Sequence, residues 1–396
     1  MQKPDTTIYD FDQIIDRRNS DSDKWNSYDE DVLPMWVADM DFISPKPVLD
    51  VLQARVEHGV FGYPNENTSF EKDLPNIRAI IIEHLAKTYG WQIETKDILL
   101  IPGVVTGFRQ ACLAFAQSDE AVLIQTPVYH PILNVAKTTG IQSQEMEMTL
   151  QANGTYIVDW DIFDNSFNAQ TRLFILCNPH NPIGKVYTQA ELERLAQTCL
   201  QNNVIICSDE IHCDLVYQEH QHVPIATIDP EIAQNTITLI APSKTYNLAG
   251  IHCSIAIIQN PEIRRNFRYA SKGLVPAVNL FGLAATQAAY QFGGPWLNQM
   301  LAYLRSNRDF LVNTIKHKLP GIRMAPPEGT YLGWLDCRAA GIEGNPQNFF
   351  LEKARVAFND GETFGRGGEG FVRLNFGCPR PILEEGLERM IKALNT

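Results

Sequence analysis

The 396-residue sequence lacks several features that would assign it to a specialised class of protein. It contains no run of about 20 apolar residues, the length that crosses a bilayer. Its first residues, MQKPDTTIYDFDQ, do not combine a basic start with an apolar run, as a secretory signal does. Internal repeats and low-complexity segments are also missing. We therefore expect a globular chain that does not enter a membrane and stays in the cytoplasm.

Positive charge is scarce. The chain has 33 Lys and Arg residues against 46 Asp and Glu residues, which gives a formal net charge of −13. Such a surface repels the phosphates of nucleic acids and anionic lipids, so we expect neither as the main partner. An anionic substrate or cofactor would need a locally positive pocket.

Paired cysteines are missing as well. None of the eight cysteines forms a CxxC pair, and their spacing fits neither a zinc site nor a disulfide framework. Most of them stand in apolar runs, such as the run that ends at Cys177. We interpret them as buried thiols in a reducing cytoplasm, and we expect no metal site.

The middle of the chain contains short apolar runs that predict buried strands. These runs lack the polar–apolar alternation of a half-exposed strand, as expected when both faces of a sheet are covered. The predicted strands are 98–101, 121–125, 173–177, 204–207, 236–240 and 254–258. Helices are predicted at 104–117 and 189–201, the second with Thr188 and Glu191 as a capping box. Strands that alternate with helices predict an α/β fold with a mostly parallel sheet and helices on both faces.

The pattern changes near residue 292, where Gly293, Gly294 and Pro295 precede a long helical stretch. Two more alternating segments, 329–336 and 371–376, then predict strands of a smaller α+β unit. We therefore expect a large domain at 51–291 and a small C-terminal domain at 292–396. Residues 1–50 have no strong periodic element and are expected to pack with the small domain.

Polar residues follow several predicted strands where those strands end. The segments PGVVT (102–106), NPHNPIG (178–184), SDE (208–210) and SKT (243–245) all hold such positions. Ligands of open α/β sheets bind at the carboxyl ends of the strands, so these segments are expected to converge. These segments supply four kinds of group: a helix start that can bind an anion, a side-chain amide, a carboxylate and a lysine. Together they suit a phosphate-bearing pyridine cofactor.

Each of these residues also has a simpler interpretation when it is taken alone. Lys244 could be a surface lysine, and Asp209 could be a helix cap. Asn178 and Asn181 could shape a proline-rich turn, and Tyr129 could be a core aromatic residue. Only their convergence favours a site.

A set of motifs also carries a family resemblance. The segments CNPHNPIG, SDEIHCDLVY and APSKTYNLAGIHCS resemble the fold-type I enzymes that use pyridoxal 5'-phosphate (PLP), the aspartate aminotransferase superfamily. The segments LPMWVADMDF, FGYPNEN, PGVVTGF, PVYHP, PEGTYLGWLDCR and FVRLNFGCPR resemble a narrower branch, the MalY/PatB-type cystathionine β-lyases and cysteine-S-conjugate β-lyases, to which cystalysin belongs. The motifs run in order from about residue 8 to residue 390.

The resemblance implies roles around the ring of the cofactor. Lys244 would bind PLP as a Schiff base and then move protons at the α-carbon of the substrate. Asp209 would face the pyridine nitrogen and keep it protonated, so that the ring can accept electrons. Asn181 and His212 would lie near the phenolic oxygen, and Tyr129 would stack on the ring.

The resemblance also implies a phosphate site. The backbone N–H groups of Val104 and Val105 would hold the phosphate at the start of a helix, and Ser243 could add a hydroxyl group. Tyr63 would reach the phosphate from the partner subunit of a homodimer. The wider superfamily has an arginine eight residues after the lysine, whereas this chain has His252 there. Backbone amides and hydroxyl groups are therefore expected to do more of the charge compensation.

Arg373 would bind the carboxylate of the substrate with a two-pronged hydrogen bond. The backbone of Val37 and Ala38 would approach the same carboxylate. The alternative for an arginine in an apolar strand is a structural ion pair, because a bare buried charge is costly.

The segment Gly365–Gly370 matches the pattern G-x-G-x-x-G of dinucleotide-binding sites. It precedes a predicted strand instead of following one, and no helix begins after it, so a dinucleotide site is not expected. A flexible loop near the mouth of the active site is the preferred interpretation.

The resemblance favours β-elimination from L-cystathionine or related cysteine S-conjugates, which yields a thiol, pyruvate and ammonia. Transamination is the alternative within the same chemistry. A third possibility is a protein that binds a transcription regulator, because some members of this branch do so. Lys244, Asp209 and Arg373 are all present, which favours a working enzyme.

Overall fold

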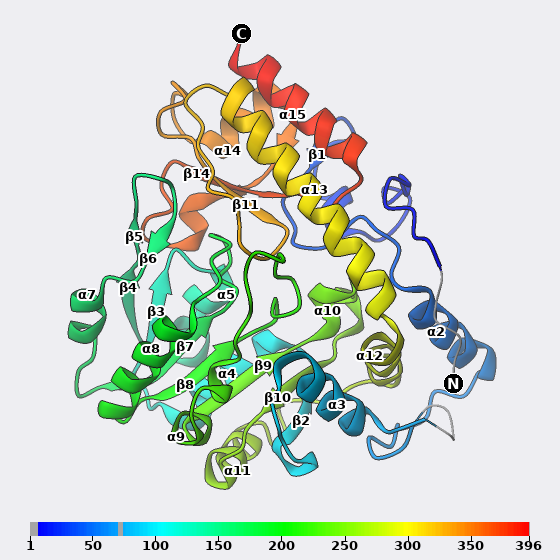
Figure 1. Ribbon diagram of the computed structural model, residues 1–396, viewed down its shortest axis with the longest axis vertical. Coiled ribbons are helices and arrows are strands. Elements are labelled where there is room, and N and C mark those ends of the chain that lie inside the picture. Colours follow the sequence, from blue (N-terminus) through cyan, green and yellow to red (C-terminus); the bar gives the residue numbers. More distant parts are fainter. Residues whose placement is uncertain (1–6, 70–73, 396) are drawn as a thin grey trace.

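The structure, a computed structural model, describes residues 7–69 and 74–395 (Figure 1). Within this part, a seven-stranded sheet has the order β2-β10-β9-β8-β7-β3-β4. The strands are β2 (Ile98–Ile101), β3 (Ala121–Thr126), β4 (Gln142–Glu147), β7 (Thr171–Cys177), β8 (Ile205–Asp209), β9 (Thr236–Ile240) and β10 (Ser254–Ile257). Only β10 runs antiparallel to its neighbours among these described strands. The expectation of a mostly parallel sheet is confirmed.

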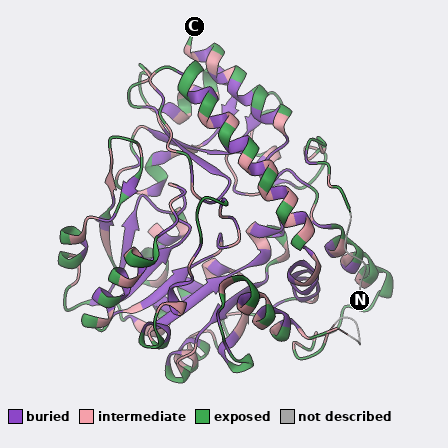
Figure 2. Cartoon of the chain, in the orientation of Figure 1, coloured by how far each residue is buried: buried purple, intermediate pink, exposed green. Residues whose placement is uncertain are grey.

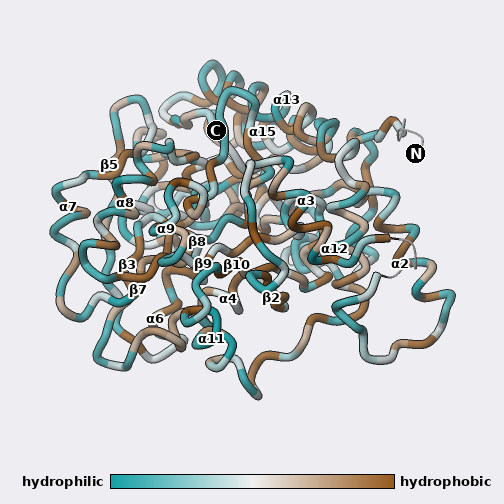
Figure 3. Tube along the Cα trace, turned by 60° about the horizontal axis from the view of Figure 1, so that its bottom comes forward, coloured by the Kyte–Doolittle hydropathy of each residue, from teal (hydrophilic) through white to brown (hydrophobic). Residues whose placement is uncertain are grey.

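Helices cover both faces of this sheet (Figure 3). The helices are α1 (Asp23–Asn26), α2 (Lys46–His58), α3 (Ile77–Tyr89), α4 (Val104–Phe115), α5 (His130–Leu133), α6 (Val135–Thr139), α7 (Trp160–Asn165), α8 (Gln189–Gln201), α9 (Pro230–Gln234), α10 (Pro242–Thr245), α11 (Pro261–Ala270), α12 (Leu280–Phe292), α13 (Gly294–Lys318), α14 (Pro346–Phe349) and α15 (Arg380–Leu394). The sheet separates α6 and α11 from α8 and α9. The predicted capping box between Thr188 and Glu191 begins α8.

The strands are apolar on both faces because each face meets its own core. In β7, Leu173 and Ile175 pack in the cluster beneath α4, whereas Phe174 and Leu176 pack in the cluster beneath α8. Figure 2 shows the central strands as buried along their length. This double covering explains the continuous apolar runs in the sequence.

The edge strand β4 escaped prediction. Its sequence, QSQEME, is polar, and most of its residues are exposed or half-buried. It pairs in parallel with β3 from Ala121 to Thr126. Because an edge strand is less covered by neighbouring elements, it can keep polar residues. It therefore has no apolar run that could identify it.

A smaller antiparallel sheet lies in the C-terminal part of the chain, in the order β11-β14-β13. Its strands are β11 (Leu332–Asp336), β13 (Asn359–Asp360) and β14 (Phe371–Asn375). The long helix α13 and the last helix α15 pack together beside it (Figure 1). Residue 292 ends α12, directly before α13 begins.

The N-terminal segment contacts this C-terminal part. Strand β1 (Leu33–Pro34) pairs in parallel with β12 (Val356–Ala357). Arg355 forms ion pairs with Asp29 and Asp31. Helix α2 packs against α12 instead, and it begins before residue 51. The expected domain limit at residue 51 therefore lies inside a helix.

The glycine-rich segment 365–370 is held by close backbone contacts. A Cβ atom on Gly368 would lie 2.0 Å from the carbonyl oxygen of Gly361, so only glycine allows this approach. The residue before this segment is also held. The backbone amide of Val128, which follows β3, donates a hydrogen bond to the carbonyl of Phe364. The glycines thus serve a tight backbone crossing.

All eight cysteines are buried and unpaired, as predicted. Burial raises the pKa of several of these thiols, for example that of Cys112 to about 12. None of the described helices is long and apolar enough to cross a membrane.

The backbone crossing at Gly368 generates a stability prediction. Gly368→Ala should lower the free energy of unfolding by about 1–3 kcal/mol, because the new methyl group overlaps the carbonyl of Gly361. Gly294→Ala is the matched control, because a Cβ atom there meets nothing within 4 Å and alanine favours helix α13. Urea unfolding of both variants measures the difference. Equal urea midpoints for the two variants would contradict a tight contact between the backbones of Gly368 and Gly361.

Candidate active site

Six of the seven described strands of the large sheet run in the same direction and end at the same edge, and the polar segments predicted from the sequence follow four of them there. Together with Ala38 they line a cavity of about 350 Å³. The other predicted residues in its wall are Val104, Val105, Tyr129, Asn181, Asp209, His212, Ser243 and Lys244. His252 borders the same cavity. The structure thus brings together the residues that the sequence placed at strand ends.

Lys244 lies in α10, the short helix after β9. Its Nζ atom donates a 2.6 Å hydrogen bond to the carbonyl oxygen of Ala38. Burial and the positive charge of Arg373 lower the pKa of the Lys244 amine to about 8, whereas the charges of Asp39 and Asp209 oppose this change. Close to neutral pH, an amine of this pKa can both take up and release a proton.

Asp209 is the last residue of β8 and is buried beside Leu239 of β9. Its carboxylate accepts one hydrogen bond, of 3.1 Å, from the amide of Ile211. Burial raises the pKa of Asp209 to about 7. A carboxyl group in this state would gain from a cationic N–H partner inside the cavity.

His212 lies in the turns after β8 and is also buried. Burial lowers its pKa to about 3, with contributions from the charges of Lys244 and Arg373. Its Nδ1 atom has no hydrogen-bond partner among the described residues. A neutral imidazole with one open nitrogen can bind a polar group in the cavity.

Helix α4 begins at the cavity without a side-chain cap. Its N-cap residue, Gly103, has φ 147° and ψ 149°, a conformation that favours glycine. The first amides of the helix, including those of Val104 and Val105, border the cavity. Uncapped N–H groups at a helix start attract an anion such as a phosphate.

His252 adopts the left-handed conformation at φ 55° and ψ 58°, and it is exposed at the wall of the cavity. It lies where the wider superfamily carries an arginine. Ser243, at the start of α10, also lines the wall. A phosphate at this end of the cavity would meet the start of α4, the Ser243 hydroxyl group and the His252 imidazole.

Arg373, in β14, is only 2% exposed. Its guanidinium group donates to Asn181 Oδ1 at 3.0 Å, to the carbonyl of Trp36 at 2.9 Å and to Asn359 Oδ1 at 2.6 Å. These three acceptors are neutral, and the Nε atom has no partner among the described residues. The structural ion pair considered above is not formed within residues 7–69 and 74–395. A buried guanidinium without a carboxylate is suited to an incoming anion.

Several residues of the site were not found by sequence reasoning. The hydroxyl group of Tyr331 donates to the Ala38 carbonyl at 2.8 Å, the same oxygen that Lys244 uses. The Asn375 amide donates to the carbonyls of Val37 and Asp39, each at 2.6 Å. Asn375 follows Arg373 by two residues and so lies on the same face of β14, a spacing that could have identified it.

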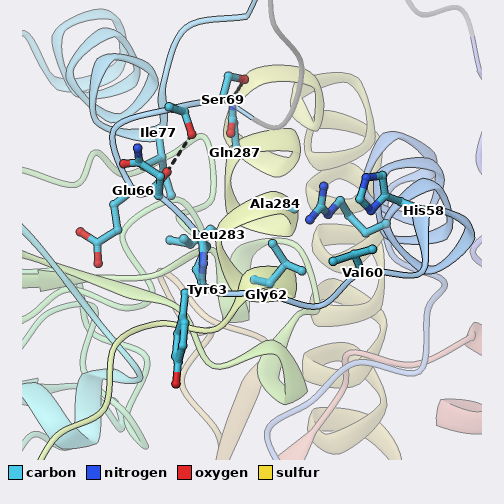
Figure 4. Close-up of a pocket in the computed structure, with 15 residues that line it drawn as sticks. His58, Val60, Gly62, Tyr63, Glu66, Ser69, Ile77, Leu283, Ala284 and Gln287 are labelled. Atoms are coloured by element: carbon cyan, nitrogen blue, oxygen red, sulfur yellow. Dashed lines mark hydrogen bonds between the residues drawn. The ribbon is translucent and has the colours of Figure 1, made fainter.

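Tyr63 lies elsewhere. It is fully exposed, in the loop between α2 and α3, and borders a second pocket of about 300 Å³. Figure 4 shows its ring directed away from Leu283 and Ala284 of α12. Within one chain, Tyr63 does not line the cavity of Lys244.

The residues present fit PLP. The cavity offers a lysine amine, a buried carboxyl group for a ring nitrogen, an uncapped helix start for a phosphate and an imidazole with an open nitrogen. The aromatic side chain of Tyr129 forms part of the same wall.

Comparison with known proteins agrees with this picture. The family model "Aminotransferase class I and II" matches residues 32–390. Cystathionine beta-lyase PatB of Bacillus subtilis is 35% identical over 395 residues, which cover 97% of this chain and 100% of PatB.

Two solved structures are similar over nearly the whole chain. The crystal structure of OvoB has a TM-score of 0.91 and 41% identity, over 98% of this chain and 100% of that one. Cystalysin from Treponema denticola, whose crystal structure contains a pyridoxal 5'-phosphate cofactor, has a TM-score of 0.92 and 31% identity, over 98% and 99%. The resemblance drawn from the motifs is confirmed, as is the fold-type I architecture, and the chain belongs to the aminotransferase class I and II family.

Proposed function

We propose that this protein is a PLP-dependent carbon–sulfur β-lyase that acts on L-cystathionine or related cysteine S-conjugates. The observation that carries the proposal is the presence of Lys244, at the cofactor-sized cavity, together with Arg373, a buried cation whose hydrogen-bond acceptors among the described residues are all neutral. PatB, which is similar over its full length, is named a cystathionine beta-lyase. Cystalysin and the C-S lyase from Staphylococcus hominis both contain PLP in their crystal structures.

The residues of this chain have distinct tasks in the proposal. Bound in the cavity, PLP would supply an electron sink for the electron pair released at the α-carbon. Asp209 would hold the proton of the ring nitrogen, and the α4 amides with Ser243 would hold the phosphate. Asn181 and His212 would bind the phenolic oxygen, and Tyr129 would cover the ring.

The substrate would be oriented by its carboxylate. Arg373 would bind this group with two parallel hydrogen bonds. The backbone N–H groups of Val37 and Ala38 would approach it from the segment whose Ala38 carbonyl accepts a hydrogen bond from Lys244. The Lys244 amine, with its pKa of about 8, would take the α-proton and return protons later. With a thiolate on the β-carbon, departure of this leaving group gives elimination.

A homodimer would complete the site. Tyr63 projects from a loop that also exposes Val60 and Phe61, at 62% and 59%. Apolar side chains gathered on one loop favour burial against another chain. We propose that a second copy covers this face and that Tyr63 enters the partner's cavity. We also place the enzyme in the cytoplasm, because its free thiols suit a reducing compartment.

The reaction can be tested by its products. The protein loaded with PLP should convert L-cystathionine or S-alkyl cysteines to thiol and pyruvate in equal amounts, together with ammonia, and should convert cystine to pyruvate, ammonia and a persulfide. Lys244→Ala should abolish this conversion, and borohydride should attach the cofactor to Lys244 in the unmodified chain, as peptide mass spectrometry would report. A keto acid that retains the sulfur, formed without pyruvate, would identify an aminotransferase instead.

Arg373→Lys should raise KM for the substrate about 10- to 100-fold, because lysine keeps the charge but loses the fork. The affinity for PLP should change little, because Arg373 does not line the cofactor cavity. The matched control is Arg338→Lys, at a 52% exposed side chain that pairs with Asp336. Steady-state kinetics and cofactor titration measure both effects. A variant that loses PLP or unfolds would support a structural role for Arg373.

The shared site can be tested with hybrid dimers. Tyr63→Ala and Lys244→Ala should each be inactive, whereas a hybrid of the two has one intact site and should show up to about half of the wild-type activity. Tyr269→Ala, at another exposed tyrosine, is the control and should stay active alone. Activity is measured after the chains are mixed and exchanged. Hybrids without activity would place Tyr63 in the site of its own chain.

A further inference from the structure

The segment Trp36–Asp41, here called the strap, has no helix or strand, yet side chains bind each of its first five carbonyls. Regular structure usually satisfies backbone carbonyls, so a strap bound in this way takes its shape from those side chains. The donors are Arg373 for Trp36, Asn375 for Val37, Lys244 and Tyr331 for Ala38, Asn375 and Lys24 for Asp39, and Asn247 and Arg17 for Met40.

Two of these donors are the cations of the proposed site. Lys244 binds the Ala38 carbonyl at 2.6 Å and Arg373 binds the Trp36 carbonyl at 2.9 Å. The strap therefore provides a hydrogen-bond acceptor for both the Lys244 amine and the Arg373 guanidinium group. If it shifted, the amine and the guanidinium group would lose an acceptor at the same time.

Lys24, in α1, contacts the strap at both ends. Its ammonium group forms a 2.5 Å ion pair with Asp41, and these side chains are 1% and 4% exposed. Its backbone carbonyl accepts a 3.1 Å hydrogen bond from the indole N–H of Trp36. One residue thus connects the first and the last position of the strap.

Neighbouring groups complete the binding of Asp41. The carboxylate also accepts hydrogen bonds from Arg17, at 2.6 Å, and from the indole of Trp25, at 2.8 Å. Arg17 binds Asp39 as well. A buried ion pair contributes little net stability, because desolvation offsets the attraction, but it allows few geometries.

We propose that Lys24 is a positioning residue, which brackets the strap so that its carbonyls orient Lys244 and Arg373. Lys24 lines neither the cofactor cavity nor the second pocket beside Tyr63. It therefore acts through the strap. The kinetic part of the inference rests on the proposed function.

The variant Lys24→Met tests whether Lys24 positions the strap, and Lys46→Met is the matched control. Lys46 forms a 2.6 Å pair with Asp50, but these side chains are 64% and 58% exposed. Three measurements are made on the full chain. They are hydrogen exchange of the peptide that covers residues 35–42, the acylation rate of Lys244 in cofactor-free protein, and KM with the affinity for PLP in the loaded enzyme.

Lys24→Met should accelerate exchange in 35–42 and leave β3 and β8 as protected as in the wild type. Acylation of Lys244 should be faster, because the amine loses the acceptor that favours its charged form. KM should rise about 10- to 100-fold, as expected for a small misplacement of binding groups, with PLP affinity kept. Lys46→Met should change none of these quantities.

Three outcomes would overturn the proposal. One is faster exchange in the strap with unchanged acylation and KM, which would make Lys24 a support of the fold only. Another is faster exchange in β3 and β8 as well, which would indicate global destabilisation. The third is a Lys24→Met protein that behaves like Lys46→Met.

Trp36→Phe provides a second test if Lys24→Met does not fold. It removes the indole bond to Lys24 and leaves no buried charge unpaired. Exchange of residues 35–42, acylation of Lys244 and KM should all increase, as for Lys24→Met. A Trp36→Phe variant identical to the wild type in these quantities would overturn the positioning role of Lys24. If wild-type protein cleaves no cysteine conjugate, the proposed function fails, and the acylation rate of Lys244 alone decides the positioning role.

Discussion

Arg373 holds a positive charge inside the protein, and the oxygens that stabilise it come from three distant parts of the chain. Trp36 belongs to the N-terminal strap, Asn181 follows β7 of the large sheet, and Asn359 belongs to the small sheet. A guanidinium group that loses water needs all of its acceptors at once. The N-terminal segment, the large sheet and the C-terminal part must therefore assemble before this charge is satisfied. The same assembly places Arg373 beside the cavity that contains Lys244.

The cavity also concentrates positive potential in an acidic protein. The chain carries a formal net charge of −13, yet Lys244, Arg373 and the uncapped start of α4 meet at one edge of the sheet. This is the locally positive pocket that an anionic ligand requires in such a chain. Asp209 supplies a carboxyl group in the wall of this cavity, and its pKa of about 7 reflects burial more than any nearby charge.

The sequence predicted the parts of this arrangement that depend on local pattern. Buried strands such as β7 are apolar on both faces, so their runs are visible without a structure. The meeting of Asp209, Asn181 and Lys244 followed from a rule of topology, because parallel strands end at a common edge. Strand β4 escaped because its edge position lets it remain polar.

Other parts depend on contacts across long stretches of sequence. Tyr331 and Ala38 are separated by 293 positions, and nothing in either segment indicates their hydrogen bond. The acceptors of Arg373 are likewise set by tertiary packing, and so its lack of a carboxylate partner could not be read from an apolar strand. Lys24 stands in a polar stretch that is typical of a surface, yet the fold buries it.

The buried cysteines have a consequence for a chain whose proposed reaction releases a thiol at each turnover. A thiolate attacks a disulfide and releases one of its sulfur atoms as a new thiolate, so a reactive surface cysteine would form a mixed disulfide with any product thiol that had been oxidised to its disulfide. Burial raises the pKa of Cys177, in the cavity wall itself, well above its ordinary value, and raises that of Cys112 to about 12. With its own sulfur atoms protonated and enclosed, the enzyme would tolerate the sulfur compounds that it produces.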